Sequence, residues 1–475
     1  MVFTGKPSRA CVHCRRRKLR CDLRKNACGQ CVRAGLSCSG YRDPDQLRIR
    51  DESQSIMRKA RGLPSTPMTT SIDTPLVDRA RAAFFSHYVL GFSKTYDVLE
   101  RIGRQAPLDQ HLAASVDAVS LAFFSFQYDA EGAAFKPARE MYLSALPLVK
   151  SAVATTEVLA SDSTLLAVLL LDLFEKITNR SPISSESWMS HVKGALALVK
   201  LRHLQQLETY TGLRLSVRLF TNMLISCVAG NFPIPPALVK LRSDIQPHLN
   251  AKDPKWQVSG LVMKYANFRG AVKEGLIAPS DIITQAKRLD GEFRSLATDM
   301  PPTWVSHRIT VLPGSPDVLE QYYDVYPDYF TAQTYNVIRI MRIMLNNLIR
   351  TTYLSMIPEN TGFHPNELNV AFATHIIDTM AKEICATGPQ FTQKPTYSSP
   401  FRKCHRYTLL FPFYVAAVFA SPETKVRDWV VQQLKSISRN SATRNASVVA
   451  EILEKRQDPD PWSVYAILGS YAFAA

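Results

Sequence analysis

Cysteine is scarce over most of this chain. Of the nine cysteines in 475 residues, only Cys227, Cys385 and Cys404 lie outside one stretch of 28 residues. Isolated thiols are typical of a reducing compartment. The first ten residues also lack the apolar segment of a secretory signal peptide and carry Lys6 and Arg9 instead. We therefore expect no disulfide framework.

Long hydrophobic runs are missing as well. The strongest apolar run, residues 165–174, is ten residues long and contains Asp172, whereas a membrane-spanning helix needs about 20 apolar residues. We therefore expect no membrane-spanning segment and no membrane partner. Residues 161–178 instead predict a buried helix that starts at a cluster of capping residues.

Motifs of common catalytic sites are also absent. The sequence contains no GxSxG, no HExxH, no phosphate-binding P-loop and no GxGxxG. His405 follows Cys404, but neighbours in sequence need not face each other, so packing is the better interpretation. We expect no enzyme, although a fused enzyme stays open because fold does not dictate function.

Acidic residues are few at the start of the chain. Residues 1–61 hold 16 Lys or Arg and 5 Asp or Glu, a net charge of +11, whereas residues 62–475 hold 41 and 36, a net +5. The basic character is therefore concentrated in the N-terminal part, as for a segment that meets a polyanion.

The 28 residues hold six cysteines as an internal repeat with a 17-residue offset. They read C-x2-C-x6-C-x6-C-x2-C-x6-C and are Cys11, Cys14, Cys21, Cys28, Cys31 and Cys38. Two tetrahedral Zn²⁺ ions need eight ligand positions, so two of six thiolates must bridge both ions. The symmetry of the repeat makes Cys11 and Cys28 natural candidates. We expect two Zn²⁺ per chain.

Other uses of these thiolates are weaker. An iron–sulfur cluster could use the same thiolate ligands, but it gives no reason for the basic run described next. Disulfides conflict with the reducing compartment that the isolated thiols indicate. His13 lies between two ligands, and we expect it to be an exposed loop residue because the cysteines already suffice.

The two halves of the repeat differ between their cysteines. The first half carries five cations within six residues: Arg15, Arg16, Arg17, Lys18 and Arg20. The corresponding residues of the second half include only Arg33. We expect a helix over 15–20 whose cations neutralise phosphates and donate to the guanine edge in the major groove. A solvated helix face is the alternative.

These residues resemble the fungal Zn(II)2Cys6 binuclear-cluster DNA-binding domain, with its pattern C-x2-C-R-x-[RK]-K-x-[KR]-C-D; Asn26-Ala27 stand where that family usually has a proline before the fourth cysteine. The resemblance implies that Cys11 and Cys28 bridge two Zn²⁺, and that Lys18, assisted by Arg17, reads CGG-type half-sites. It also implies that Arg15, Arg16 and Arg20 contact phosphates.

The rest of the chain divides into a linker and a helical region. After a DNA-binding domain at 1–41 we expect a basic, then Pro/Ser/Thr-rich linker at 42–75. Apolar residues seven apart at 49, 56 and 63 are too few to predict a coiled coil, so a homodimer stays open. Residues 76–475 predict an all-α regulatory region, with helices over 161–178, 191–201 and 332–349. Proline and glycine at 300–316 mark a seam between two lobes.

Several segments of residues 76–350 resemble the second fungal-specific transcription factor domain, an all-helical regulatory region. Residues 317–330 carry four acidic residues and five aromatic rings. We expect these rings to pack on a lobe, with an activation segment as the alternative. Arg339, Arg342 and Arg350 share one side of a predicted helix, which we expect to be solvated rather than to bind an acidic metabolite.

The sequence thus predicts a nuclear, sequence-specific transcription factor for RNA polymerase II genes, with double-stranded DNA and the transcription machinery or co-regulators as partners. The resemblance suggests a secondary-metabolite gene cluster as the target, with nutrient metabolism as the alternative. A regulator that acts mainly through protein partners and binds DNA weakly is the runner-up.

Overall fold

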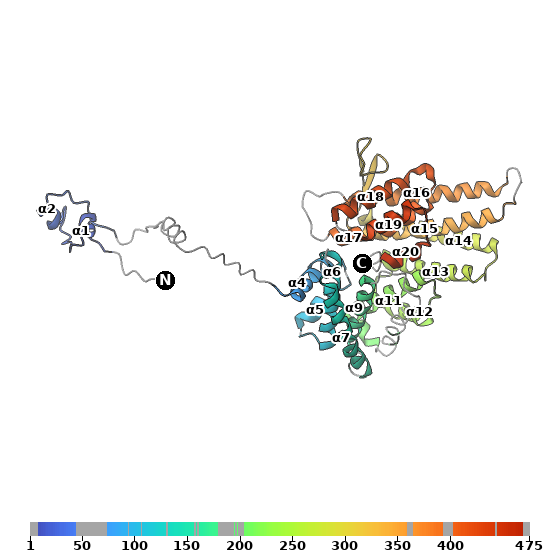
Figure 1. Cartoon of the computed structure of the whole chain (residues 1–475), viewed down its shortest axis with the longest axis horizontal. Helices are drawn as coiled ribbons and strands as arrows, with labels where there is room; N and C mark the ends of the chain where they lie inside the picture. The colour runs from blue at the N-terminus through green and yellow to red at the C-terminus, as the bar shows by residue number, and fades with distance from the viewer. Residues whose placement is uncertain are drawn as a thin grey trace. The chain divides into compact units, whose positions relative to one another are not determined.

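The computed structural model divides into two units, residues 1–73 and 74–475 (Figure 1). The residues it describes are 8–43, 74–93, 95–105, 107–129, 132–155, 158, 161–178, 194, 197, 204–358, 364–392, 402–441 and 444–468. The heptad-like positions at 49–63, nearly all of the linker and most of the predicted helix 191–201 lie outside these ranges. The domain limits at 41 and 75 and the seam at 300–316 stay predictions.

The N-terminal unit contains two five-residue helices, α1 (Val12–Arg16) and α2 (Gly29–Arg33). Each begins directly after the first cysteine of its half-repeat. Cys11 and Cys28 are the N-cap residues, and their sulfurs accept hydrogen bonds from the backbone N–H of Cys14 and Cys31, respectively. Helices this short do not persist on propensity alone, so the cysteine cluster must hold them.

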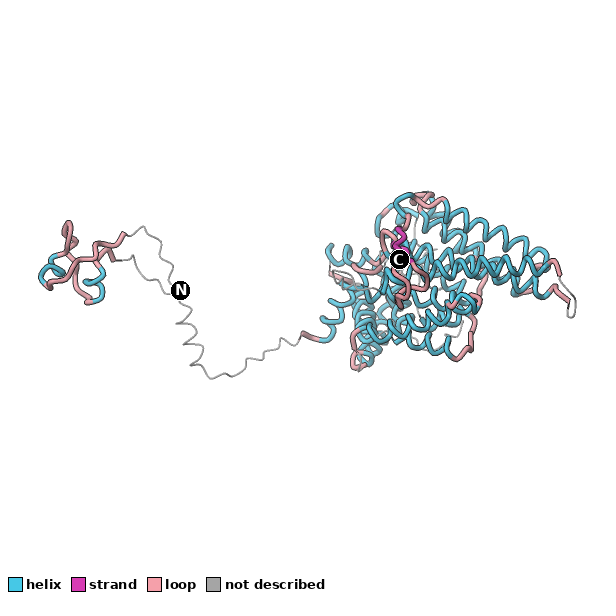
Figure 2. Tube along the Cα trace, turned by 90° about the horizontal axis from the view of Figure 1, so that it is seen from above, coloured by secondary structure: helices cyan, strands magenta, loops and turns pink. Residues whose placement is uncertain are grey.

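The large unit is built from helices, with one short pair of strands (Figure 2). Its elements are α4 (Leu76–Ala83), η1 (Phe84–Val89), α5 (Asp97–Gln105), α6 (Gln110–Gln127), α7 (Phe135–Ala154), α9 (Asp162–Thr178), η2 (Leu204–Glu208), α11 (Tyr210–Gly230), α12 (Pro236–Ile245), η3 (Gln246–His248), α13 (Pro254–Lys273), α14 (Pro279–Thr298), η4 (Pro302–Trp304), β1 (His307–Thr310), β2 (Tyr322–Val325), α15 (Tyr329–Ser355), α16 (Asn366–Thr392), α17 (Arg402–Phe419), η5 (Pro422–Thr424), α18 (Val426–Ser441), α19 (Arg444–Glu454) and α20 (Pro461–Leu468). The expected all-α region is confirmed.

The predicted helix over 161–178 is confirmed as α9, which packs against α6 and α7. The hydroxyl of Ser161 caps it by accepting the Thr164 N–H at 3.2 Å. Asp172, which interrupts the apolar run, is buried and accepts from Lys176 Nζ at 2.7 Å and from Asn222 Nδ2 at 3.0 Å. A buried charge is tolerated when it is paired and hydrogen-bonded, so the helix remains a core helix.

One described helix, α11, is long and apolar enough to span a membrane by length and composition, and 67% of its apolar window is buried inside the fold. A core helix of a globular unit passes the same test. The predicted run at 165–174 is part of a different helix, α9.

The aromatic and acidic segment at 317–330 folds onto the helices. β2 pairs antiparallel with β1, where the Arg308 guanidinium contacts both oxygens of Asp324 at 2.8 and 3.0 Å. Tyr326 is buried and accepts a hydrogen bond from Arg339 Nη2 at 2.6 Å. The packed interpretation is therefore confirmed for the described residues.

The predicted helix at 332–349 is confirmed within α15, but its arginine face is not solvated. Arg339 Nε donates to Glu383 of α16 at 3.0 Å, and Arg342 Nε donates to Asp290 of α14 at 2.9 Å. Neighbouring helices cover both sides of α15, as Figure 1 shows for α14 and α16. The pattern of spaced cations was misleading because buried cations matched by carboxylates have the same spacing as exposed ones.

Candidate zinc centre and nucleic-acid surface

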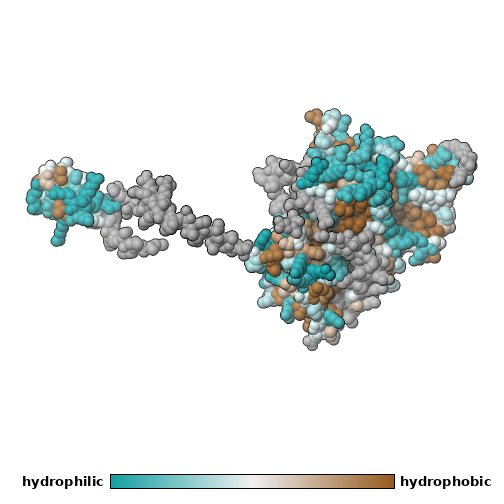
Figure 3. Space-filling view, in the orientation of Figure 1, coloured by the Kyte–Doolittle hydropathy of each residue, from teal (hydrophilic) through white to brown (hydrophobic). Residues whose placement is uncertain are grey.

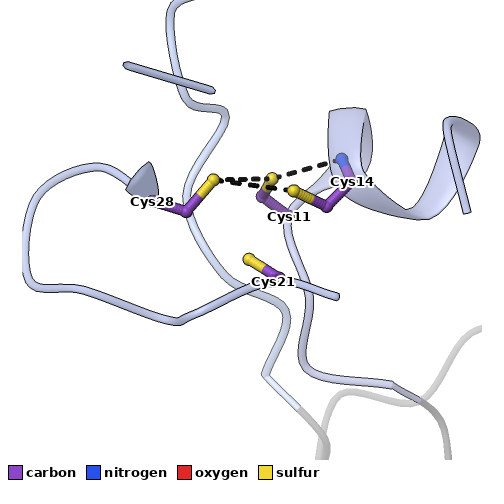
Figure 4. Close-up of side chains that lie close together, drawn as sticks. All are labelled: Cys11, Cys14, Cys21 and Cys28. Carbon is purple, nitrogen blue, oxygen red and sulfur yellow. Dashed lines mark hydrogen bonds between the residues drawn. The ribbon is translucent and has the colours of Figure 1, made fainter. Parts of the chain in front are cut away.

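The six cysteines converge into two groups of four. Cys11, Cys14, Cys21 and Cys28 form one group and Cys11, Cys28, Cys31 and Cys38 the other, with the sulfurs of each group within 4.8 Å of one another. Figure 4 shows the first group, with the four sulfur atoms pointing toward a common centre.

The sulfur spacing fits two tetrahedral ions. Sulfurs placed about 2.3 Å from one Zn²⁺ lie about 3.8 Å apart in a tetrahedron. The Sγ–Sγ distances from Cys28 to Cys11 and to Cys14 are both 3.6 Å, and that from Cys11 to Cys31 is also 3.6 Å. The only two cysteines common to both groups of four are Cys11 and Cys28, the pair singled out by the symmetry of the repeat.

The protein environment treats these thiols unequally. The backbone N–H of Cys14 lies 3.4 Å from the Cys11 sulfur and lowers the pKa of that thiol to about 6. Burial raises the pKa of Cys14, and the hydrogen bond with Cys28 raises the pKa of Cys31 to about 12. The thiolate forms of Cys14 and Cys31 are therefore unfavourable without a cation, and a bound metal ion would favour them.

Two reciprocal hydrogen bonds join the halves of the repeat. The Asp22 carboxylate accepts from the Gly29 N–H at 3.0 Å, and the Ser39 hydroxyl accepts from the Val12 N–H at 3.1 Å. Asp22 and Ser39 are 17 residues apart, as are Val12 and Gly29, so each half closes the first turn of the other half's helix. Sequence reasoning missed both roles, although the offset of the repeat relates the two pairs.

Asp22 approaches Gly29 closely. A Cβ at residue 29 would lie 2.7 Å from Asp22 Oδ2, so the Asp22 side chain would have to shift. Tyr41 adds a further tie, because its hydroxyl donates to the Arg24 carbonyl. Neither contact was evident in the cysteine spacing.

The expected helix over 15–20 is wrong in extent, because α1 ends at Arg16. The Leu19 N–H bonds the Cys14 carbonyl at 2.9 Å and the Lys18 N–H bonds the Arg15 carbonyl at 3.3 Å. These two bonds form a Schellman motif, which turns the chain out of the helix. The turn brings Cys21 back to the cluster, which a continued helix would not do.

Lys18 therefore adopts a left-handed conformation, with φ of 50°. The second half ends α2 in the same way: the Leu36 N–H bonds the Cys31 carbonyl at 2.9 Å, and Gly35 has φ of 64°. Lys18 and Gly35 are 17 residues apart. The conformation favours glycine, yet the first half has lysine there.

The basic run lies on the surface of the unit. Arg16, Arg17, Lys18 and Arg20 are exposed, whereas Arg15 is half-buried and donates to the Ala10 carbonyl at 2.5 Å. Figure 3 shows a mainly hydrophilic surface on the visible face of this unit. Six thiolates with two Zn²⁺ carry a net charge of −2, so the flanking cations must outweigh the metal cluster at an anionic surface.

The remaining described thiols have no neighbours that would activate them. Burial raises the pKa of Cys227 to about 11 and raises that of Cys385 further. His405 stacks on Tyr329 at 4.4 Å and contacts the Gly91 carbonyl at 3.2 Å, as packing predicts. The side chain of Cys404 lies outside the described residues. Buried thiols of high pKa are poor nucleophiles.

This arrangement combines a site that could hold two metal ions with an exposed cationic surface in one small unit. Residues 9–48 match the family model described as the fungal Zn(2)-Cys(6) binuclear cluster domain. The chain thus contains this domain, which binds two zinc ions and occurs in fungal DNA-binding transcription factors. The comparisons with curated proteins and with solved structures found no match.

Proposed function

We propose that this protein is a nuclear transcription factor for RNA polymerase II genes that reads CGG-like half-sites in the major groove through Lys18. The observation that supports this most directly is the placement of an exposed lysine at the left-handed position where the second half of the repeat has glycine. A strained backbone conformation costs about 1–2 kcal/mol for a residue other than glycine. A residue kept there despite this cost is a candidate for a functional contact.

The position of Lys18 suits base recognition. Directly after the last turn of α1, its side chain leaves a helix end whose preceding residues, Arg16 and Arg17, are also exposed. An ammonium at the end of a short helix can approach guanine O6 and N7 while Arg16 contacts the DNA backbone. Arg17 is the assisting base contact in this arrangement.

The phosphate contacts fall to Arg16, Arg20 and Arg15. Arg16 and Arg20 are exposed, and Arg15 is half-buried with one Nη donating to the Ala10 carbonyl. Guanidinium groups bind phosphate oxygens in a bidentate manner, and each neutralised phosphate adds to the salt dependence of binding. These contacts orient the unit without selecting a sequence.

The metal ligands in this proposal are the six clustered cysteines, with Cys11 and Cys28 as the bridging pair. Each bridging sulfur also receives a backbone N–H, at 3.4 Å in both halves. Hydrogen bonds to a thiolate that is shared by two cations fix its position and balance its charge. When bound, the ions supply the cross-links that a unit of this size otherwise lacks.

The large helical unit is proposed to regulate the output through co-regulators, with a secondary-metabolite gene cluster as the target and nutrient genes as the alternative. The support for the pathway is the family resemblance alone. Mapping the promoters bound by the protein in cells would decide between these targets.

Selection from a random pool of duplexes by the full-length protein tests the function. Enrichment of CGG triplets, with affinity that falls steeply as salt rises, is the expected result. Recovery of a pool without any enriched triplet would instead favour a regulator that acts through protein partners.

A further inference from the structure

A cavity of about 300 Å³ lies in the large unit between α11, α13 and α15, whose positions Figure 1 shows. Residues of α20 and of the loop before α13 complete its wall. The volume lies within the range of small-molecule sites, roughly 300–1,000 Å³.

One face of α11 lines the cavity over more than three turns. Leu213, Val217, Thr221 and Ile225 follow at four-residue intervals, and all four are half-buried. An apolar helix stripe is normally covered by a neighbouring element. In the described part of the unit this stripe faces a cavity instead.

The opposite walls carry several apolar and aromatic side chains. α15 contributes Phe330, Val337 and Met341, and α13 contributes Trp256. Two contacts fix the indole of Trp256 in place. The Arg242 guanidinium lies 4.1 Å from the centroid of the indole ring, and the indole N–H donates to the side-chain oxygen of Gln246. Preset aromatic surfaces bind ring-containing ligands with little loss of side-chain entropy.

Three polar side chains of the wall already have partners within the fold. The hydroxyls of Thr221 and Thr334 donate to the Val217 and Phe330 carbonyls, both at 2.9 Å. The charge of Arg214 is balanced by Asp97 at 3.0 Å. A ligand therefore gains little from these groups, and apolar burial must supply its affinity.

We propose that this cavity is a binding site for a neutral, mainly apolar small molecule of drug-like size. A ligand that binds the folded large unit and not the unfolded chain stabilises that unit by mass action. This site goes beyond the proposed DNA function, because none of its residues belongs to the N-terminal unit, and either proposal can fail without the other.

The test uses the full-length protein without DNA and the probe N-phenyl-1-naphthylamine, a neutral apolar dye that brightens in apolar surroundings. We expect saturable binding of one dye per chain and a rise in the unfolding temperature of the large unit. Val217→Trp and Ile225→Phe fill the cavity from the α11 stripe, and each should weaken dye binding more than about tenfold. Val153→Trp is the matched control, since Val153 is exposed on α7 and lies outside the cavity wall.

The proposal is overturned if the wild-type protein binds no dye, if binding does not saturate, or if the filled variants bind as the wild type does. Loss of binding in Val153→Trp would also overturn it, since that variant leaves the cavity open. If Val217→Trp and Ile225→Phe both fail to fold, dye binding by Thr221→Val tests the proposal instead. This substitution removes a hydroxyl from the cavity wall at nearly constant side-chain volume. Binding that is unchanged or a few times tighter supports the apolar site, and weaker binding contradicts it.

Discussion

Replacing Lys18 by glycine should make the N-terminal unit more stable and less specific for DNA. Lys18 has φ of 50°, and this conformation costs about 1–2 kcal/mol for a residue with a Cβ. Glycine removes that strain but gains freedom in the unfolded chain, an opposing term of about 0.5–1 kcal/mol. The net expected gain is therefore about 1 kcal/mol.

The same change removes the proposed contact with guanine. Losing a specific base contact should cost about 1–3 kcal/mol of discrimination between a CGG-containing duplex and a scrambled one. Salt-dependent binding to both duplexes should persist, because the arginines remain.

Stability is measured as the urea concentration at which the full-length protein releases zinc to a metallochromic dye, and discrimination as the ratio of affinities for the two duplexes. Gly35→Lys is the matched control: it places the same strain in the second half and should release zinc at lower urea. Earlier zinc release from Lys18→Gly would refute the strain argument. An unchanged affinity ratio would refute the contact.

Three further changes test other parts of the structure. Cys14→Ala removes a ligand from one group of four, and native mass spectrometry should show loss of the two-zinc form. Gly29→Ala places a Cβ 2.7 Å from Asp22 Oδ2. The variant should lose about 1–3 kcal/mol of stability, and zinc should therefore be released at a lower urea concentration. Asp290→Ala leaves Arg342 buried without its carboxylate, and thermal unfolding should show a loss of about 3–5 kcal/mol.

Controls separate these effects from general damage. Glu292→Ala removes a half-buried carboxylate that pairs with the exposed Lys264 and lies on the same helix as Asp290. This change should alter stability by less than about 1 kcal/mol. Two zinc ions retained in Cys14→Ala would count against the six-cysteine cluster. Equal losses from Asp290→Ala and Glu292→Ala would show that burial of the ion pair is unimportant.

The metal centre was predictable because tetrahedral coordination restricts cysteine spacing. Six cysteines must fill eight ligand positions, and the 17-residue repeat makes Cys11 and Cys28 equivalent. These two facts predicted the bridging pair, and the two groups of four sulfurs have the same two cysteines in common. The end of α1 was not predictable in the same way, because five cations in a row are compatible with a continued helix. Only the Schellman bonds and the return of Cys21 to the cluster end the helix at Arg16.

In the large unit, periodic apolar residues predicted the helices but not their partners. α9 and α15 appear where the pattern placed them. The burial of Arg339 and Arg342 depends on carboxylates 44 and 52 residues away in sequence, which local patterns do not reveal. The cavity was hidden for the same reason: its α11 stripe has the sequence of an ordinary core face.

The most direct test of the central claim is DNA binding by the full-length protein during zinc removal, followed by fluorescence anisotropy of a labelled CGG duplex. Binding should fall as the two ions are chelated and return when two equivalents of zinc are restored, while a scrambled duplex binds more weakly throughout. Binding that survives removal of both ions, or that does not distinguish the duplexes, would contradict the claim that a zinc-folded unit reads the sequence.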